Sequence, residues 1–73
     1  MSITQFLRTR ADKNGVYSLV EYLNTNHHMG IEVKRFGLSW VVYTGNNDRG
    51  QYFTSGKKVF RFLLNLGIDK ERK

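Results

Sequence analysis

Residues 38–44, with the sequence LSWVVYT, are the stretch that decides the fold of this chain. Successive side chains of a β-strand point to opposite faces of a sheet, so this stretch divides into two sets. The sets are Leu38, Trp40 and Val42 on one face and Ser39, Val41 and Tyr43 on the other. Both sets contain apolar side chains, which is typical of a strand buried on both faces. We therefore expect residues 38–44 to form the central strand of a sheet.

A shorter strand is predicted on either side of this one. Residues 31–34 alternate apolar and charged side chains, the pattern of a half-buried strand, and residues 51–54 form a short third strand. Gly37 marks the first turn, and the run GNNDRG at 45–50 is rich in turn-forming residues. Because these connections are short, we expect consecutive strands to pair as an antiparallel meander.

Apolar residues at helical spacing predict one helix before the sheet and another after it. Val16 begins an apolar stripe that runs to about Asn26. Ser55 is a good N-cap for the last helix, and Gly67 is expected to end it as the C′ residue. Each helix must bury its apolar stripe, and one face of the sheet supplies the surface against which both can pack. The predicted core consists of Val16, Leu19, Val20, Leu23, Val33, Trp40, Val42, Val59, Phe60, Leu63 and Leu66.

The sequence thus predicts an α+β fold, a single small domain in which a three-stranded antiparallel sheet lies between two helices in the chain. We expect a flexible basic tail over residues 1–14, a compact binding domain over 15–68 and a charged C-terminal tail over 69–73. The polar run 9–14 and the charged end of the chain favour mobile termini.

Composition restricts the class of protein further. The chain has 73 residues, enough for one domain, and it has no cysteine for disulfides or thiolate metal sites. No apolar run is long enough to span a bilayer, and the start lacks the pattern of a signal peptide. We expect a cytoplasmic monomer with no membrane partner. The net charge of +6 attracts nucleic acid, an acidic membrane surface or an acidic protein face, although it also lies in the range that simply keeps a small domain soluble.

Catalysis is not expected, and neither is a cofactor or a metal. The two histidines, His27 and His28, are adjacent, so they do not share a helical face from which to chelate one ion. Their position at the predicted end of the first helix suits the helix dipole, and we favour that interpretation over a metal or acid–base role. No Ser-His-Asp or Cys-His arrangement can be argued from the remaining residues.

Basic and aromatic side chains are therefore the candidate functional residues. Lys57 and Arg61 are four residues apart and share a face of the last helix, and Lys58 lies close to them. Cations at the start of a helix are disfavoured by its dipole, and function can explain such a local cost; a plain solvated face is the alternative. The predicted partner-binding residues are Arg8, Arg10, Lys34, Arg35, Tyr43, Arg49, Tyr52, Phe53, Lys57, Lys58 and Arg61.

The aromatic residues of the second and third strands have two interpretations. Tyr52 and Phe53 are neighbours on one strand, so at least one of them must face away from the helices. An outward ring near Arg49 can serve as a stacking platform or as an anchor for a protein partner. Ordinary cross-strand packing is the alternative for each ring taken singly.

The element order and the opening of the last helix resemble a double-stranded RNA-binding domain. The segment SGKKVFR at 55–61 is where that family places its basic set, and Lys57, Lys58 and Arg61 match those positions. The resemblance implies that these side chains contact RNA phosphates across a groove. Two departures count against it: the last helix is bulky, and the Phe36–Gly37 turn is too tight to hold the basic loop expected there.

The whole chain is also similar to the small transcription regulators of Xanthomonas oryzae phages that bind host RNA polymerase. The similarity lies in the chain length, the lack of cysteine and proline, the strand WVVY at 40–43 and the segment RGQYF at 49–53. It implies a protein of the host cytoplasm that contacts both large subunits of the bacterial polymerase, displaces sigma and inhibits initiation, with antitermination as a further role. We take this as the first interpretation and a nucleic-acid-binding module as the alternative.

Overall fold

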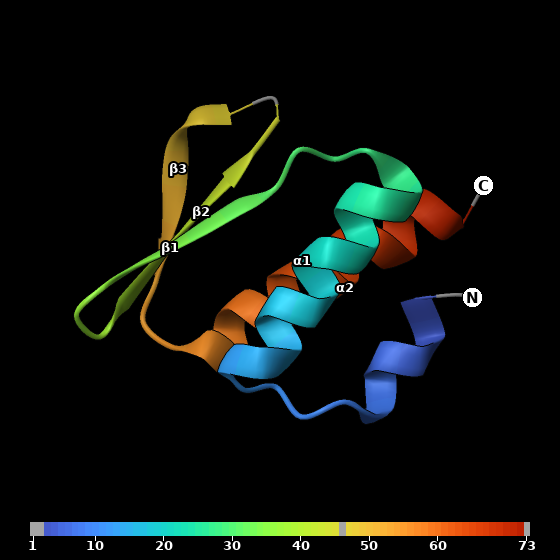
Figure 1. Cartoon of the computed structure of the whole chain (residues 1–73), viewed down its shortest axis with the longest axis horizontal. Coiled ribbons are helices and arrows are strands. Elements are labelled where there is room, and N and C mark those ends of the chain that lie inside the picture. The colour runs from blue at the N-terminus through green and yellow to red at the C-terminus, as the bar shows by residue number, and fades with distance from the viewer. Residues whose placement is uncertain (1–2, 46, 73) are drawn as a thin grey trace.

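The computed structural model describes residues 3–45 and 47–72, and it shows two helices packed beside a three-stranded sheet (Figure 1). In chain order the elements are the 3₁₀ helix η1 (Ile3–Arg8), the helix α1 (Lys13–His27), the strands β1 (Glu32–Phe36), β2 (Ser39–Thr44) and β3 (Asn47–Phe53), and the helix α2 (Gly56–Glu71). The predicted α+β class and the predicted order of elements are confirmed. Within the described residues, neither long helix has the length and apolar character needed to cross a membrane.

Strand β2 is the central strand, as its two apolar faces predict. It pairs antiparallel with β1 on one side and with β3 on the other. In the first pair Val42 lies opposite Val33, and in the second Trp40 lies opposite Phe53. Strand β3 begins earlier than predicted, because Thr44 already pairs with Asn47 across a tight connection and the register then shifts between Val42 and Thr44.

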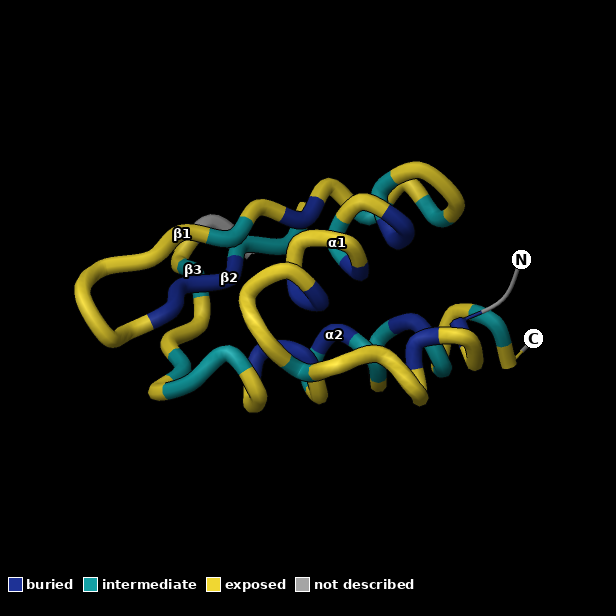
Figure 2. The backbone as a smooth tube through the Cα atoms, turned by 60° about the horizontal axis from the view of Figure 1, so that its bottom comes forward, coloured by how far each residue is buried: buried dark blue, intermediate teal, exposed yellow. Residues whose placement is uncertain are grey.

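The core lies between the two helices and the face of the sheet that carries Trp40 and Val42. Its buried positions line the inner sides of these elements (Figure 2). The buried side chains are Ile3, Phe6, Val16, Leu19, Tyr22, Leu23, Ile31, Trp40, Val42, Val59, Phe60 and Leu63. Val20, Val33 and Leu66, which were predicted to be core residues, are partly buried and pack against this cluster.

Both long helices begin at a side chain that caps the first turn. The Ser55 hydroxyl accepts a hydrogen bond from the Lys58 N–H at 3.3 Å, as its predicted role as N-cap requires. The cap of α1 is Asp12, whose carboxylate accepts the Gly15 N–H at 2.9 Å. Asp12 therefore starts α1 three residues earlier than the apolar stripe indicates.

The prediction that Gly67 ends the last helix is wrong. Helix α2 continues through Gly67 to Glu71, and Gly67 is a buried helical residue. A Cβ atom on Gly67 would lie 2.6 Å from Cδ1 of Ile3 and 3.0 Å from Cδ2 of Leu23. The glycine is thus explained by close packing of η1 and α1 against α2, and residues 69–71, expected in the charged tail, belong to the helix.

The predicted boundary of the basic tail at residue 14 also differs from the structure. Residues 3–8 form η1, and Ile3 and Phe6 are buried in the core beside α2. The Phe6 ring meets the Tyr22 ring edge-on, with 5.2 Å between the centroids. Residues 3–8 therefore belong to the folded domain. A helix this short is marginally stable by itself, and burial of its apolar side chains against the core stabilises it.

Candidate binding surfaces

One face of the sheet is left uncovered by helices in the part of the chain that the structure describes, and we call it the outer sheet face. Since Trp40 and Val42 point into the core, Val41 and Tyr43 must point to the opposite side. The register places Lys34 and Tyr52 beside Val41 on that side. The residues of the outer sheet face are Glu32, Lys34, Phe36, Ser39, Val41, Tyr43 and Tyr52.

Tyr43 lies close against the backbone of the neighbouring strand. Gly50 has a φ of +72°, and a Cβ atom there would lie 2.9 Å from Cε1 of Tyr43 and 2.8 Å from Cγ1 of Val41. On the other side, the Lys34 amine lies 5.7 Å from the centroid of the Tyr43 ring. The absence of a side chain at Gly50 thus leaves the space that the Tyr43 ring occupies. Val41 is fully buried, although no helix covers the outer sheet face.

Three large apolar side chains at the sheet remain exposed. Tyr52 on β3 is 73% exposed and Phe36 at the end of β1 is 59% exposed. Leu38 was predicted to share one face of the strand with Trp40, but it lies in the two-residue turn between β1 and β2 and is 88% exposed. This turn projects beyond the ends of the helices in both views (Figures 1 and 2), which explains why nothing buries Leu38.

Two predicted binding residues of the sheet point to the helices instead. The Phe53 ring packs on Phe62 of α2, with 5.2 Å between the centroids, so of the two neighbouring aromatics Tyr52 is the one that faces outward. The Arg35 guanidinium lies over the Trp40 ring at 4.8 Å from its centroid. Arg35 therefore covers the edge of the core, and Phe53 belongs to it, because the alternation of β1 and β3 sends both to the inner face.

The first two turns of α2 carry an exposed group of cations, which we call the α2 basic surface. It consists of Lys57, Lys58 and Arg61, and all three side chains are exposed. The Lys58 amine donates a hydrogen bond to the Thr54 hydroxyl at 3.0 Å. Residues 56–68 contain no Asp or Glu, so no acid in the first three turns of the helix balances this charge.

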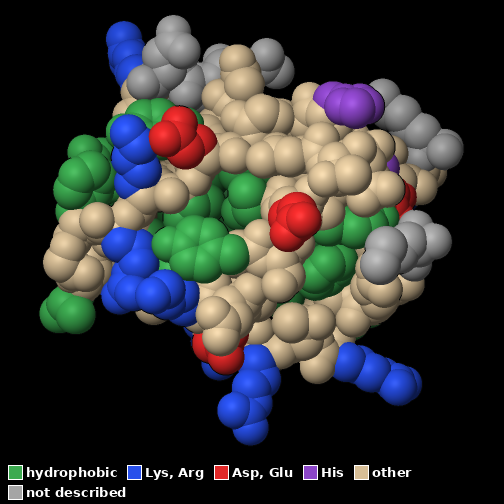
Figure 3. Space-filling view, viewed as in Figure 1, with side chains coloured by type: hydrophobic (Ala, Val, Ile, Leu, Met, Phe, Trp, Pro, Cys, Tyr) green, Lys and Arg blue, Asp and Glu red, His purple; other side chains and the backbone are tan. Residues whose placement is uncertain are grey.

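The remaining predicted cations occupy other parts of the molecule. Arg8 ends η1 and Arg10 lies in the connection to α1, both exposed. The Arg10 carbonyl oxygen lies so close to Gly15 that a Cβ atom on residue 15 would be 2.1 Å from it, so the close approach of this connection to the first turn of α1 requires glycine. Arg49 is exposed on β3 next to Gly50. On the face shown in Figure 3, Lys and Arg side chains lie beside apolar side chains over the sheet, and others project from the lower edge.

A hydrogen-bonded cluster around Glu71 was not predicted from the sequence. One oxygen of its carboxylate accepts the Ile3 N–H at 2.9 Å, and the other accepts the Tyr22 hydroxyl and lies 2.9 Å from Nε2 of His27. The partners are 44 to 68 residues away from Glu71 in sequence, so no local sequence pattern could have predicted these contacts. His27 thus has a structural partner, and the cluster joins η1, α1 and α2.

The cluster shifts the pKa of two of its members. The hydrogen bond from the Ile3 backbone, together with those from Tyr22 and His27, lowers the pKa of Glu71 from 4.5 to about 2. Burial and the bond to Glu71 raise the pKa of Tyr22 to about 12. Both shifts favour the arrangement in which Tyr22 donates to an ionised Glu71.

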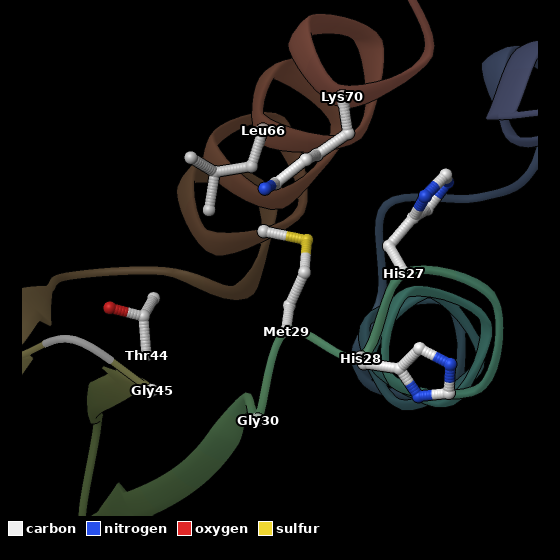
Figure 4. A pocket seen from close by; sticks show the side chains of 8 residues that line it. All are labelled: His27, His28, Met29, Gly30, Thr44, Gly45, Leu66 and Lys70. Carbon is white, nitrogen blue, oxygen red and sulfur yellow. The ribbon is translucent and has the colours of Figure 1, made fainter.

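A pocket of about 370 Å³ lies next to this cluster, between the end of α1 and the second half of α2. Figure 4 shows Lys70 and Leu66 of α2 on one side and Met29, with the turn that follows α1, on the other. His27 and His28 stand at its edge. Among the described residues, no three His, Cys, Asp or Glu side chains gather closely enough to hold a metal ion.

No family model, curated protein or solved structure matches this chain.

Proposed function

We propose that this protein is a phage-type transcription regulator that binds bacterial RNA polymerase, displaces sigma and inhibits initiation of transcription. The observation that carries the proposal is the α2 basic surface. Lys57 and Lys58 stand in the first turn of a helix, where the dipole makes a cation unfavourable by a few tenths of a kcal/mol or more. An acidic partner surface offsets that cost on binding, and it steers the approach of a body whose net charge is +6.

The tip of the β1–β2 hairpin favours a protein as the partner. Its two-residue turn consists of Gly37 and Leu38, and Leu38 projects an apolar side chain into solvent. An exposed large apolar side chain suits an apolar pocket on a protein, and it offers nothing to a phosphate group. The combination of a cationic helix start and an apolar tip therefore suits docking on a protein face better than docking on a duplex.

Binding of duplex RNA is the second candidate function. The fold has the helix–sheet–helix order that the resemblance to double-stranded RNA-binding domains implies, and the α2 basic surface occupies the matching position. Under this function the three cations contact phosphates, so log affinity should fall linearly as log salt rises. Loss of each phosphate contact should then flatten that slope by about one unit.

A pull-down with the tagged protein from bacterial lysate tests the proposal, with and without nuclease. Recovery of core RNA polymerase depleted of sigma, unchanged by nuclease, is the expected result. The double variant Lys57→Gln/Arg61→Gln should recover much less polymerase. Lys70→Gln/Arg72→Gln is the matched control, because it removes the same charge from the other end of α2 and should bind normally. Recovery of structured RNA that nuclease abolishes, without polymerase, would favour the second candidate.

A further inference from the structure

The outer sheet face carries one aromatic ring in each of three successive rows of side chains. Rows on one face of a sheet follow every second residue, about 7 Å apart along the strands. The register defines the rows as Glu32 with Tyr43, Lys34 with Val41 and Tyr52, and Phe36 with Ser39. Each of the three strands therefore contributes one ring, and no two rings share a row.

Small side chains separate the three rings on this face. Val41 at the centre is fully buried, so its neighbours on the face cover it, and Gly50 has no side chain beside Tyr43. Gly50 is required there, because a Cβ atom would lie within 3 Å of both Tyr43 and Val41. Tyr43 is held between this backbone and the Lys34 amine, so one ring of the set is fixed in place before any ligand arrives.

Tyr52 and Phe36 keep most of their surface in water. Their exposed fractions of 73% and 59% leave the rings accessible to a stacking partner. A flat aromatic ring stacks on any nucleobase, because every base has a π-face, and side chains of this kind are the platforms on which single strands are held. Diagonal neighbours on a sheet such as Tyr43 and Tyr52 are about 7–8 Å apart, which leaves room for a base against Tyr52.

The charge around the face suits a polyanion. Residues 32–61, which form the sheet and the first two turns of α2, contain six of the 12 cations of the chain and two of its six acids. Among the described side chains of the outer sheet face the acid is Glu32, whose carboxylate lies 3.6 Å from the Lys34 amine. Three of the six cations form the α2 basic surface and Arg35 lies over the Trp40 ring on the inner face. Six cations against two acids still give this segment a net charge of +4, which attracts a polyanion to this half of the molecule at long range.

We propose that the outer sheet face binds single-stranded nucleic acid, with bases stacked on the exposed rings of Phe36 and Tyr52 next to the fixed Tyr43 ring, and with the backbone attracted by the net positive charge of this half of the molecule. This site goes beyond the proposed function, because it uses a different surface from the α2 basic surface. Substitution of Tyr52 therefore tests single-strand binding without altering the α2 basic surface.

Fluorescence anisotropy with a short labelled oligothymidine tests the site. The unmodified protein should bind it saturably, and a duplex of the same length should bind more weakly. Tyr52→Ala should weaken binding by about tenfold, the usual effect of removing one stacking ring. Tyr52→Phe, which keeps the ring, should bind like the unmodified protein. Tyr52 is largely exposed, so neither change should alter the melting temperature.

Three results would overturn this site. One is the absence of saturable binding to oligothymidine, and another is equal affinity of Tyr52→Ala and the unmodified protein. The third is concentration-dependent self-association that Tyr52→Ala abolishes while oligothymidine has no effect, which would assign the face to a second copy of the chain. Loss of polymerase binding in Lys57→Gln/Arg61→Gln bears on the proposed function alone, because those side chains lie outside the outer sheet face.

Discussion

The Tyr22 hydroxyl donates a hydrogen bond to the Glu71 carboxylate and so joins the second half of α1 to the last residue of α2. The same carboxylate holds the Ile3 N–H and lies beside His27. An acid at the end of a helix is disfavoured by the helix dipole, and here three donors compensate for that position. Glu71 therefore fixes the start of η1 onto the two long helices.

Replacing Glu71 by Gln should loosen the N-terminal segment before it affects the sheet. The neutral amide accepts more weakly than a carboxylate, so the bonds from Ile3 and Tyr22 lose their charge assistance. Amide hydrogen exchange should become faster over residues 3–8 and change little in β2. Equal protection of residues 3–8 in the variant and the unmodified protein would show that apolar packing alone holds η1.

The contribution of Glu71 should disappear in acid. Its folded pKa of about 2 lies below the ordinary value of 4.5, so the unfolded chain takes up the proton first as the pH falls. The stabilisation is complete above pH 4.5 and is lost as the pH falls towards 2. Thermal melts should therefore show a gap between the unmodified protein and Glu71→Gln at neutral pH that narrows over this range. A gap that stays constant would contradict the lowered pKa.

Gly67→Ala should destabilise the protein even though alanine is the better helix former. The helix gains up to about 1 kcal/mol in intrinsic propensity, but the new methyl group lies 2.6 Å from Cδ1 of Ile3 and forces that side chain out of place. Ile3→Val removes this Cδ1 atom, so the double variant should recover part of the lost stability. Denaturant unfolding of the two single variants and the double variant measures the coupling.

Trp40→Ala should cost about 3–5 kcal/mol, enough to unfold much of a domain this small. Trp40 is 4% exposed, and it contacts α1 through Tyr17 and α2 through Gly56. Leu38→Ala is the control from the same strand region, and it should change the unfolding free energy by less than about 0.5 kcal/mol because Leu38 is exposed. Similar effects of the two substitutions would show that the faces of β2 are assigned wrongly.

The sheet and the long helices could be predicted from local patterns. The alternation at 38–44 identified β2 as the central strand, and Ser55 was recognised as the cap of α2. Gly67 misled the prediction because a glycine after an apolar stripe usually ends a helix. Its real cause is the approach of Ile3, a contact across 64 positions that no local pattern contains. The burial of Ile3 and Phe6 was missed for the same reason.

The candidate sites were only partly predictable. Lys57, Lys58 and Arg61 are exposed, as expected for residues outside the apolar stripe of the last helix. Strand alternation required one outward aromatic in the third strand, and that residue is Tyr52. The sequence could not divide these residues into two surfaces, because the pairing register decides which side chains share a face. Phe36 was not among the predicted binding residues, although it shares the outer sheet face with Tyr43 and Tyr52.

The most direct test of the central claim is a titration of the labelled protein with purified bacterial core RNA polymerase and, in the same buffer, with duplex RNA. The proposed function predicts saturable binding to the core enzyme, competition by sigma, and an affinity far above that for the duplex. Lys57→Gln/Arg61→Gln should weaken the complex mainly by slowing association, whereas Lys70→Gln/Arg72→Gln should not. Failure to bind the core enzyme, or tighter binding to duplex RNA with a salt dependence that the first variant flattens, would contradict the account.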